Sequence, residues 1–194
     1  TALSRSGLSA PVQALLRHAL LTPGETFFDY GCGRGDDVRG LQANGFAAQG
    51  WDPHYAAGEA RLAADVVNLG FVVNVIEDFD ERVAALRNAF QLARQVLAVA
   101  VMLYGNMPPP GRPYRDGYRT QRNTFQKYFT QSEFKEFVET ALDAEAIPVG
   151  PGILLVFADK MVEQRFLFGR QRSRRSVSTE RFHRLPRSHA PVTP

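Results

Sequence analysis

The segment Asp29-Tyr-Gly-Cys-Gly-Arg-Gly35 combines residue types that could bind a small ligand. Its glycines, Gly31, Gly33 and Gly35, alternate with larger residues, and the segment follows a short apolar run that begins at Thr26. Glycine adopts positive φ readily and lets a ligand approach the main chain closely. In an α/β sheet, the turn after the first strand needs both properties. The spacing therefore predicts a ligand-binding turn that joins a strand to a helix.

Two acids near these glycines indicate the charge of the ligand. Asp29 stands where the dinucleotide fingerprint G-x-G-x-x-G has no acid, and a carboxylate there would repel a pyrophosphate. It suits a cation instead, and S-adenosylmethionine (SAM) offers an α-ammonium and a sulfonium. Asp52 lies at the predicted end of the second strand, where an acid can accept both hydroxyls of a ribose. We therefore predict SAM as the cofactor; the alternative is a glycine-rich turn that binds nothing.

The elements that must position this turn alternate between strand and helix. Apolar residues at helical spacing predict helices, and continuous apolar runs predict buried strands of a parallel sheet. The order predicts a Rossmann-like α/β fold, with a mostly parallel sheet and helices on both faces. A first predicted helix, Pro11–Leu21, would cap the sheet edge. The other predicted helices are Asp36–Asn44, Asp78–Arg94 and Gln131–Leu142, and the predicted strands are Thr26–Asp29, Phe46–Trp51, Gln95–Leu103, Ala144–Val149, Ile153–Ala158 and one that starts with Ala64–Val67.

Other stretches carry local signals of their own. Thr130 and Glu133 form the S/T-x-x-E pattern of a capping box at the start of a helix. Residues 104–123 are rich in Pro, Gly and charge without periodicity, which predicts a long loop. From Arg170 onward Arg and Ser dominate, followed by Pro, which predicts a linker or disordered tail. The predicted organisation is a helical cap (1–22), a SAM-binding domain (23–168) and a basic tail (169–194).

The glycine segment also carries a family resemblance. Asp29–Gly35 resembles the first motif of class I SAM-dependent methyltransferases, and Asp52 matches the acid of their second strand. This resemblance implies a methyltransferase that uses SAM. The cofactor-binding residues that we expect are Asp29, Tyr30, Gly31, Gly33, Gly35, Trp51, Asp52, Pro53, Asn68 and Leu69.

A narrower resemblance is to methyltransferases associated with DNA phosphorothioation systems. It covers residues 1 to about 168 and rests on several short segments that occur in order. Members of that family continue beyond this length, and the chain begins at Thr1, so we expect it to be part of a longer protein. The segments are Thr1-Ala-Leu-Ser-Arg5, Phe28–Asp36, Gly50-Trp-Asp-Pro53, Val67-Asn-Leu-Gly-Phe71, Asn74-Val-Ile-Glu77 and Thr124-Phe-Gln-Lys127.

The chain departs from the superfamily between its second strand and the next. Only twelve residues separate Asp52 from Asp65, too few for the helix, strand and acidic turn that usually hold the adenine. We therefore expect a shortened region here and a different adenine pocket. The nearest candidates for stacking and edge contacts are Trp51, Pro53 and Asn68-Leu69.

Residues 68–77 are the expected place of methyl transfer. Asn68-Leu-Gly-Phe71 resembles the Asn/Asp-Pro-Pro-Tyr/Phe motif by which amino-methyltransferases hold the target amino group, although both prolines are missing. Glu77 lies in a stretch that bears an acid in many small-molecule methyltransferases. Each has a structural alternative: a buried Phe at a strand end, and a carboxylate that stabilises a helix N-terminus. Asn68, Phe71 and Glu77 are the candidate catalytic residues.

Cysteine and histidine add little chemistry. Cys32 lies inside the cofactor turn without a preceding Pro, so we interpret it as a packing residue rather than a nucleophile. The four His show no metal-ligand spacing, and no metal is predicted. His54 borders the predicted site and is a candidate base.

A basic and aromatic segment could bind the acceptor. Between residues 112 and 129, cations alternate with Tyr and Phe, a composition that suits phosphate pairing and base stacking. The candidate substrate-binding residues are Arg115, Tyr118, Arg119 and Arg122. The alternative is a solvated loop whose Phe125 and Phe129 enter the core.

Charge and composition limit the function classes. The net charge is +3, and eight Arg against two Glu after residue 162 give the tail +6, so residues 1–162 carry −3. A weakly acidic body does not suit a general nucleic-acid binder, so polyanion affinity must come from local patches or the tail. A single cysteine fits the cytoplasm, and no apolar run is long enough for a membrane span.

Three hypotheses follow from the sequence. The first is a SAM-dependent methyltransferase that acts on nucleic acid or a nucleotide in a DNA-modification or defence setting. The second is a methyltransferase of a small metabolite. The third is a SAM-binding module that regulates a partner and transfers nothing. The oligomeric state and the acceptor atom are not indicated by the sequence.

Overall fold

The structure is a computed structural model that describes residues 7–105 and 110–182, with side chains through residue 172. The chain divides into two compact units, Thr1–Asp159 and Lys160–Pro194. Within the described ranges, no helix has the length and apolar character needed to cross a bilayer.

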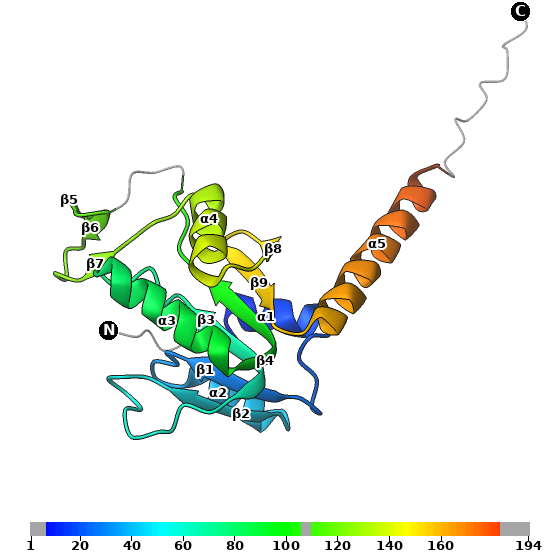
Figure 1. The fold of residues 1–194 in the computed structure, drawn as a ribbon, viewed down its shortest axis with the longest axis horizontal. Coiled ribbons are helices and arrows are strands. Elements are labelled where there is room, and N and C mark those ends of the chain that lie inside the picture. The colour runs from blue at the N-terminus through cyan, green and yellow to red at the C-terminus, as the bar shows by residue number, and fades with distance from the viewer. Residues whose placement is uncertain (1–6, 106–109, 183–194) are drawn as a thin grey trace, which may run out of the picture. The chain divides into compact units, whose positions relative to one another are not determined.

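A six-stranded sheet forms the centre of the first unit (Figure 1). Its order is β2-β1-β3-β4-β9-β8, and every neighbouring pair is parallel except those that involve β9. The sheet is therefore mostly parallel, as the apolar runs predict. The strands are β1 (Thr26–Tyr30), β2 (Ala47–Trp51), β3 (Ala64–Gly70), β4 (Ala93–Ala100), β8 (Ala146–Gly150) and β9 (Ile153–Phe157).

Helices cover both faces of this sheet (Figure 1). Helices α3 (Phe79–Leu92) and α4 (Gln131–Leu142) bury Leu86 and Phe134 in one core with strand residues such as Val67. Helices α1 (Ala10–Arg17) and α2 (Asp36–Ala43) lie on the opposite face, where the Ser9 N–H donates to Asp37 Oδ1 at 2.7 Å. The Rossmann-like α/β prediction is confirmed.

Helix α1 corrects one expectation. The sequence analysis placed it at the sheet edge, but it contacts β3 and β4, the two central strands. Val12, Ala14 and Leu15 are almost fully buried. An edge would expose half of such an apolar stripe, whereas the face of a parallel sheet buries it.

The interval between β2 and β3 is short, as predicted. Residues 53–63 form neither a helix nor one of the sheet strands, and a single bridge joins Asp52 to Ala56. As a consequence, β2 is an edge strand of the sheet, and the loop of residues 53–63 follows its carboxyl end.

The predicted loop 104–123 is wrong at residues 112–114 and 117–119, which form strands, while the rest of its described residues are loop and turn. Residues 112–126 form a three-stranded antiparallel sheet of β5 (Arg112–Tyr114), β6 (Gly117–Arg119) and β7 (Phe125–Gln126). Arg115 has φ +51° in the two-residue turn between β5 and β6. A Cβ at Gly117 would lie 2.7 Å from the Gln126 carbonyl oxygen, so glycine permits this close pairing. Turn chemistry, which hydrophobic periodicity does not reveal, makes the hairpin.

The second unit contains α5, which spans Lys160–Phe182. The sequence analysis expected a linker or disordered tail over 169–194, whereas the helix continues to Phe182. Arg and Gln favour helix, and no proline occurs between Lys160 and Pro186, so composition alone misled the prediction. Residues 183–194 lie outside the described residues, and so does the Thr1–Arg5 segment.

Helix α4 begins with the predicted capping box. The Glu133 N–H donates to Thr130 Oγ1 at 3.2 Å, and the Thr130 N–H donates to Glu133 Oε2 at 2.8 Å. These two bonds satisfy donors that the first turn leaves without partners. They fix the start of a helix whose Phe134 and Val138 are fully buried.

We predict that Thr130→Ala lowers the free energy of unfolding by about 1 kcal/mol, because the helix loses its N-cap acceptor. Urea denaturation followed by circular dichroism measures the change. Thr140→Ala is the matched control, since Thr140 is exposed in the same helix and Ala has the higher helix propensity. Equal losses in both variants would contradict the role of the cap.

Candidate active site

The crossover point of the sheet lies between β1 and β3. From β1 the chain continues to β2 on one side, while β3 pairs on the other side, and ligands of open α/β sheets bind at such a point beyond the carboxyl ends of the strands. Here Asp29 of β1 and Asn68 of β3 are register partners. Asn68 Nδ2 donates to Asp29 Oδ1 at 2.8 Å, and both side chains are at least 96% buried. The structure thus joins two residues predicted for the cofactor site.

This hydrogen bond fixes the orientation of the Asn68 amide. A carboxylate only accepts hydrogen bonds, so the amide nitrogen of Asn68 must face Asp29. Asn68 Oδ1 is left buried without a hydrogen-bond partner among the described residues. An unsatisfied buried acceptor costs free energy of about 1–3 kcal/mol, which a donating ligand would recover. The position therefore suits a group that carries N–H or O–H donors.

The glycine turn has the backbone that the sequence predicts. Gly31, Gly33 and Gly35 have φ of +84°, +54° and +76°, in the left-handed region that favours glycine. The Gly31 and Cys32 N–H groups donate to the Trp51 carbonyl at 2.7 and 3.0 Å, which ties the turn to the end of β2.

Asp52 organises the space beside this turn. Its carboxylate accepts the N–H groups of Gly33 at 3.0 Å, His54 at 2.8 Å and Tyr55 at 3.0 Å. The side chain is 91% buried. A carboxylate has about four acceptor positions, so these three bonds leave capacity for a ligand hydroxyl. Asp52 therefore holds the turn and the following loop together, a role that the sequence analysis did not include.

A cavity of about 420 Å³ opens between the glycine turn and this loop. Its size falls in the range of small-molecule sites. The Arg34 guanidinium lies 5.8 Å from the centre of the Tyr55 ring. Sequence reasoning missed Arg34, Arg39 and Tyr55; the position of Tyr55 three residues after the predicted ribose acid was the available signal. The lining residues are Cys32, Gly33, Arg34, Gly35, Asp36, Arg39, Tyr55 and Ala56.

Other predicted cofactor residues are less accessible. The Tyr30 and Leu69 side chains belong to the core beneath α3 and α4 and are at most 4% exposed, so only their main chains can face a ligand. Trp51 is half-buried between the Tyr30 ring, 5.1 Å away, and the Arg61 guanidinium, also at 5.1 Å. Pro53 is exposed.

Cys32 has the environment of a packing residue. Burial is the main factor that raises the pKa of its thiol to about 12, and the charges of Asp29 and Asp52 raise it further. A Cβ at Gly50 would lie 2.8 Å from Cys32 Cβ, so glycine in β2 makes room for this side chain. A thiol that stays protonated is a poor nucleophile, which supports the packing interpretation.

The remaining candidate catalytic residues lie in different surroundings. Phe71 has φ +62° and packs against Ala14 and Ala100, on the face that α1 covers. Strained backbone of this kind clusters at functional sites. Glu77 accepts a hydrogen bond from the Tyr114 hydroxyl at 3.1 Å and pairs with Arg115, also at 3.1 Å. The structure thus brings a candidate catalytic acid to a candidate substrate-binding cation, and the two charges compensate each other.

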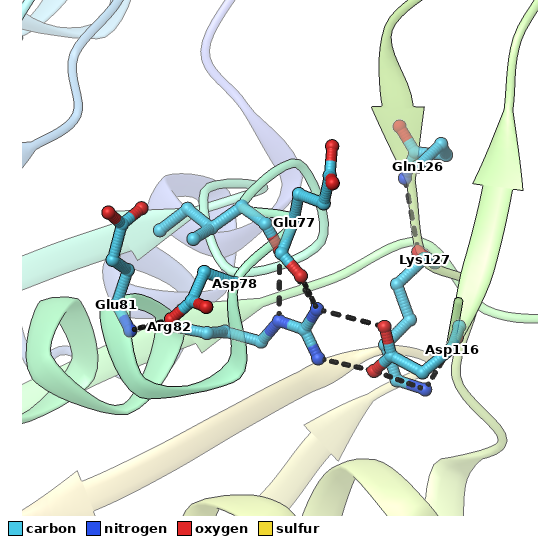
Figure 2. A network of polar contacts seen from close by, with 8 residues as sticks. Glu77, Asp78, Glu81, Arg82, Asp116, Gln126 and Lys127 are labelled. Carbon is cyan, nitrogen blue, oxygen red and sulfur yellow. Dashed lines mark hydrogen bonds and ion pairs between the residues drawn. The ribbon is translucent and has the colours of Figure 1, made fainter. Parts of the chain in front are cut away.

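Arg82 anchors the β5–β6 hairpin to the start of α3 (Figure 2). This side chain is only 1% exposed. It donates to the Ile76 carbonyl at 2.9 and 3.1 Å and to both oxygens of Asp116, in the hairpin turn, at 2.7 and 3.3 Å. Lys127 lies 3.4 Å from the same carboxylate. The Arg82 guanidinium and then Lys127 hold the pKa of Asp116 below its usual value.

The other candidate substrate-binding residues lie on or near this hairpin. The Arg119 guanidinium lies 4.3 Å from the centre of the Tyr114 ring. Tyr118 contacts the Tyr128 ring edge to face at 6.0 Å, and Arg122 is exposed in the turn before β7. The role of Arg82 is not predictable from the sequence, because its partner is 34 residues away.

Metal chemistry has no obvious centre in this site. In the described ranges, no group of three or more His, Cys, Asp and Glu side chains is arranged to hold a metal ion. The His54 side chain is exposed, and the main-chain N–H of His54 donates a hydrogen bond to Asp52 Oδ1.

Solved structures share this fold. No protein-family model and no curated protein matches the sequence. The chain is similar to the 1,6-didemethyltoxoflavin-N1-methyltransferase of Burkholderia thailandensis, solved with S-adenosylhomocysteine (SAH), at 18% identity, over 76% of each chain and with a TM-score of 0.53. It is also similar to CalS10, an amino pentose methyltransferase of Micromonospora echinaspora solved with SAM, at 15% identity over 77% of this chain and 90% of that one, with a TM-score of 0.53.

A third similar structure is the CcbJ methyltransferase of Streptomyces caelestis, at 13% identity over 78% of this chain and 90% of that one, with a TM-score of 0.52. At these identities the likeness concerns the fold. The chain has the Rossmann-like fold of class I SAM-dependent methyltransferases, as the glycine turn and the alternating elements predict.

We predict that Asp116→Asn lowers stability at neutral pH by about 0.5–1 kcal/mol, since Asp116 is partly exposed and water screens its pairing with Arg82. A lowered pKa in the folded state stabilises above the unfolded value, near 3.8, and this contribution is lost as the pH falls through the folded pKa. The difference between wild type and variant should therefore begin to shrink as the pH falls below about 3.8 and vanish only below the folded pKa.

Urea denaturation at several pH values between 3 and 7 measures this difference. Asp80→Asn is the control, because Asp80 is an exposed acid in the first turn of α3 and no ion pair of Asp80 occurs among the described residues. A wild-type advantage over Asp116→Asn that is as large at the lowest pH as at pH 7 would contradict the Arg82–Asp116 anchor.

Proposed function

We propose that this chain is a SAM-dependent methyltransferase. The observation that carries the proposal is the buried Asn68–Asp29 hydrogen bond at the crossover point, next to three glycines with positive φ. The fold shared with the three methyltransferases supports the same function.

The residues present fit this cofactor. Asn68 Oδ1 is a buried acceptor without a partner among the described residues, and the Asp29 carboxylate beside it favours a positive charge, so the α-ammonium of SAM is a suitable ligand for this corner. Asp52 retains acceptor positions for ribose hydroxyls. The cavity beside Tyr55 would take the adenosine end, in place of the missing strand and helix.

Methyl transfer from SAM would require little acid–base catalysis by the protein. A sulfonium supplies an activated methyl group, so orientation and exclusion of water can provide much of the rate when the acceptor is a good nucleophile. Asn68 and Phe71 would orient the acceptor at the end of β3. Glu77 already binds Tyr114 and Arg115, so we assign it the positioning of the hairpin rather than proton transfer.

For the acceptor we propose a nucleic acid or a nucleotide. The basic and aromatic hairpin supports this class, and so does the resemblance to methyltransferases associated with DNA phosphorothioation systems. A small-metabolite acceptor is the second candidate, because the similar structures include a toxoflavin-precursor and an amino pentose methyltransferase. A SAM-binding module without transfer activity is the third.

Mass spectrometry after incubation with SAM distinguishes the three candidates. DNA, RNA and nucleotide pools would be incubated with the chain and with SAM that carries a deuterated methyl group. Labelled polynucleotide or nucleotide supports the proposal, and label only in a metabolite extract supports the second candidate. SAM binding without any labelled product supports the third.

We predict that the chain binds SAH and that Asp52→Ala weakens this binding at least tenfold. A charge-assisted hydrogen bond contributes about 1.5–3 kcal/mol, and 1.4 kcal/mol corresponds to a factor of ten. Isothermal titration calorimetry measures the affinity. Asp65→Ala is the matched control, since it removes the same charge at the amino end of β3, where Asp65 binds Thr26. No heat of binding in the wild type would remove the cofactor assignment.

We predict that Gly33→Val abolishes SAH binding while the chain stays folded. A branched side chain resists φ of +54° and would occupy the space beside the turn. Gly45→Val imposes similar strain at φ +82°, where a Cβ would meet no atom within 4 Å, far from the turn in sequence. Circular dichroism and calorimetry on the same samples should separate the two variants; normal binding by Gly33→Val would show that this turn does not contact the cofactor.

A further inference from the structure

Two arginines face each other on the β5–β6 hairpin. Arg112 and Arg119 are direct register partners across the antiparallel pair, so their side chains leave the same face a few ångströms apart. Both residues are exposed, and the described part of the chain contains no ion pair for either. Like charges at directly opposite positions destabilise a strand pair. Such a pair is stabilised when an anion lies between the two guanidinium groups.

An aromatic ring and two anchors fix this pair in place. Tyr114 shares its face, because it follows Arg112 by two residues, and the Arg119 guanidinium lies 4.3 Å from its ring centre. The Tyr114 hydroxyl donates to Glu77. Buried Arg82 holds Asp116 in the adjoining turn (Figure 2). The arginines therefore stand on a platform whose position is already set by the body of the domain, which lowers the cost of ordering them around a ligand.

Neighbouring cations are not equivalent to this pair. Arg115 pairs with Glu77, and Lys127 shares the Asp116 carboxylate with Arg82, so both side chains are already engaged within the protein. Among the described residues of the β5–β6 hairpin, Arg112 and Arg119 are thus the cations without an ion pair. The excess is local, since residues 1–162 together carry −3.

We propose that Arg112 and Arg119 form a phosphate-binding pair for the acceptor. This inference rests on the proposed methyltransferase function and narrows its acceptor to a molecule that bears a phosphate. Guanidinium groups match phosphate oxygens in bidentate geometry, and two of them balance the one to two negative charges of a phosphate. Arg112 belongs to the alternating basic and aromatic segment but is not among the candidate substrate-binding residues, because the register that pairs it with Arg119 is not visible in the sequence.

The experiment measures how binding of a fluorescein-labelled single-stranded oligothymidylate depends on salt. The full 194-residue chain is used throughout, so that the arginines of α5 contribute equally to every sample. Each phosphate contact on a single strand contributes about 0.7 to the log–log salt slope. Arg112→Ala/Arg119→Ala should flatten the slope by about 0.7 if the pair holds one phosphate and by about 1.4 if it holds two.

The control is Arg17→Ala/Arg94→Ala, which removes the same charge at exposed positions outside the hairpin, although Arg94 lies 3.9 Å from the Asp65 carboxylate. It should leave the slope unchanged. A slope change in the Arg112/Arg119 variant no larger than in this control overturns the proposal. Arg112→Lys/Arg119→Lys keeps the charge without the fork geometry, so it should restore the slope but bind more weakly than the wild type; failure to restore the slope overturns the assignment to charge at these positions.

Competition with thymidine 5′-monophosphate identifies the source of the phosphate. Displacement of the oligonucleotide from the wild type shows that a free nucleotide suffices, and retention shows that the pair needs a polynucleotide. SAH affinity is measured separately by calorimetry and should be the same in all variants. If the wild type does not bind SAH, the methyltransferase proposal is contradicted, while the phosphate result still holds.

Discussion

The hydrogen bond between Asn68 and Asp29 is the interaction on which the site depends. It joins the carboxyl ends of the neighbouring parallel strands β1 and β3, at the crossover point of the sheet. The buried apolar strand residues around it exclude water. A buried carboxylate is tolerated there only because it is hydrogen-bonded. The glycine turn starts two residues after Asp29, and Asp52 closes it from the next strand. Three strand ends are thus fixed relative to one another by polar groups at the edge of an apolar sheet.

A second polar centre links the hairpin to this frame. Arg82 spans from the main chain before α3 to the turn between β5 and β6, and few residues of its kind are so completely buried. Asp116 is partly exposed, so the pair contributes modestly to stability, but the contacts of the buried Arg82 side chain hold the hairpin beside the start of α3. The same arrangement explains why Glu77 and Arg115 meet. Glu77 and Arg115, which the sequence suggests as separate functional residues, both belong to the contact between the hairpin and the start of α3.

Local signals allowed much of the fold to be predicted. The glycine turn, the βαβ unit and the capping box at Thr130 depend on residues only a few positions apart, and the structure confirms all three. Features set by distant partners were missed. The role of Arg82 requires a residue on another element, and the orientation of Leu69 into the core depends on which face α3 covers. Alternation along β3 places Asn68 and Leu69 on opposite faces, but the sequence does not say which face is the site.

Val72 restricts one end of the glycine turn. A Cβ at Gly31 would overlap the Val72 side chain, so the segment after β3 rests directly on the main chain of Gly31. The cavity is lined instead by residues 32–36, toward the other end of the turn. A ligand in the cavity can therefore contact the main chain of Gly33 and Gly35 without displacing Val72, whereas any side chain at position 31 would push the segment after β3 away from the turn.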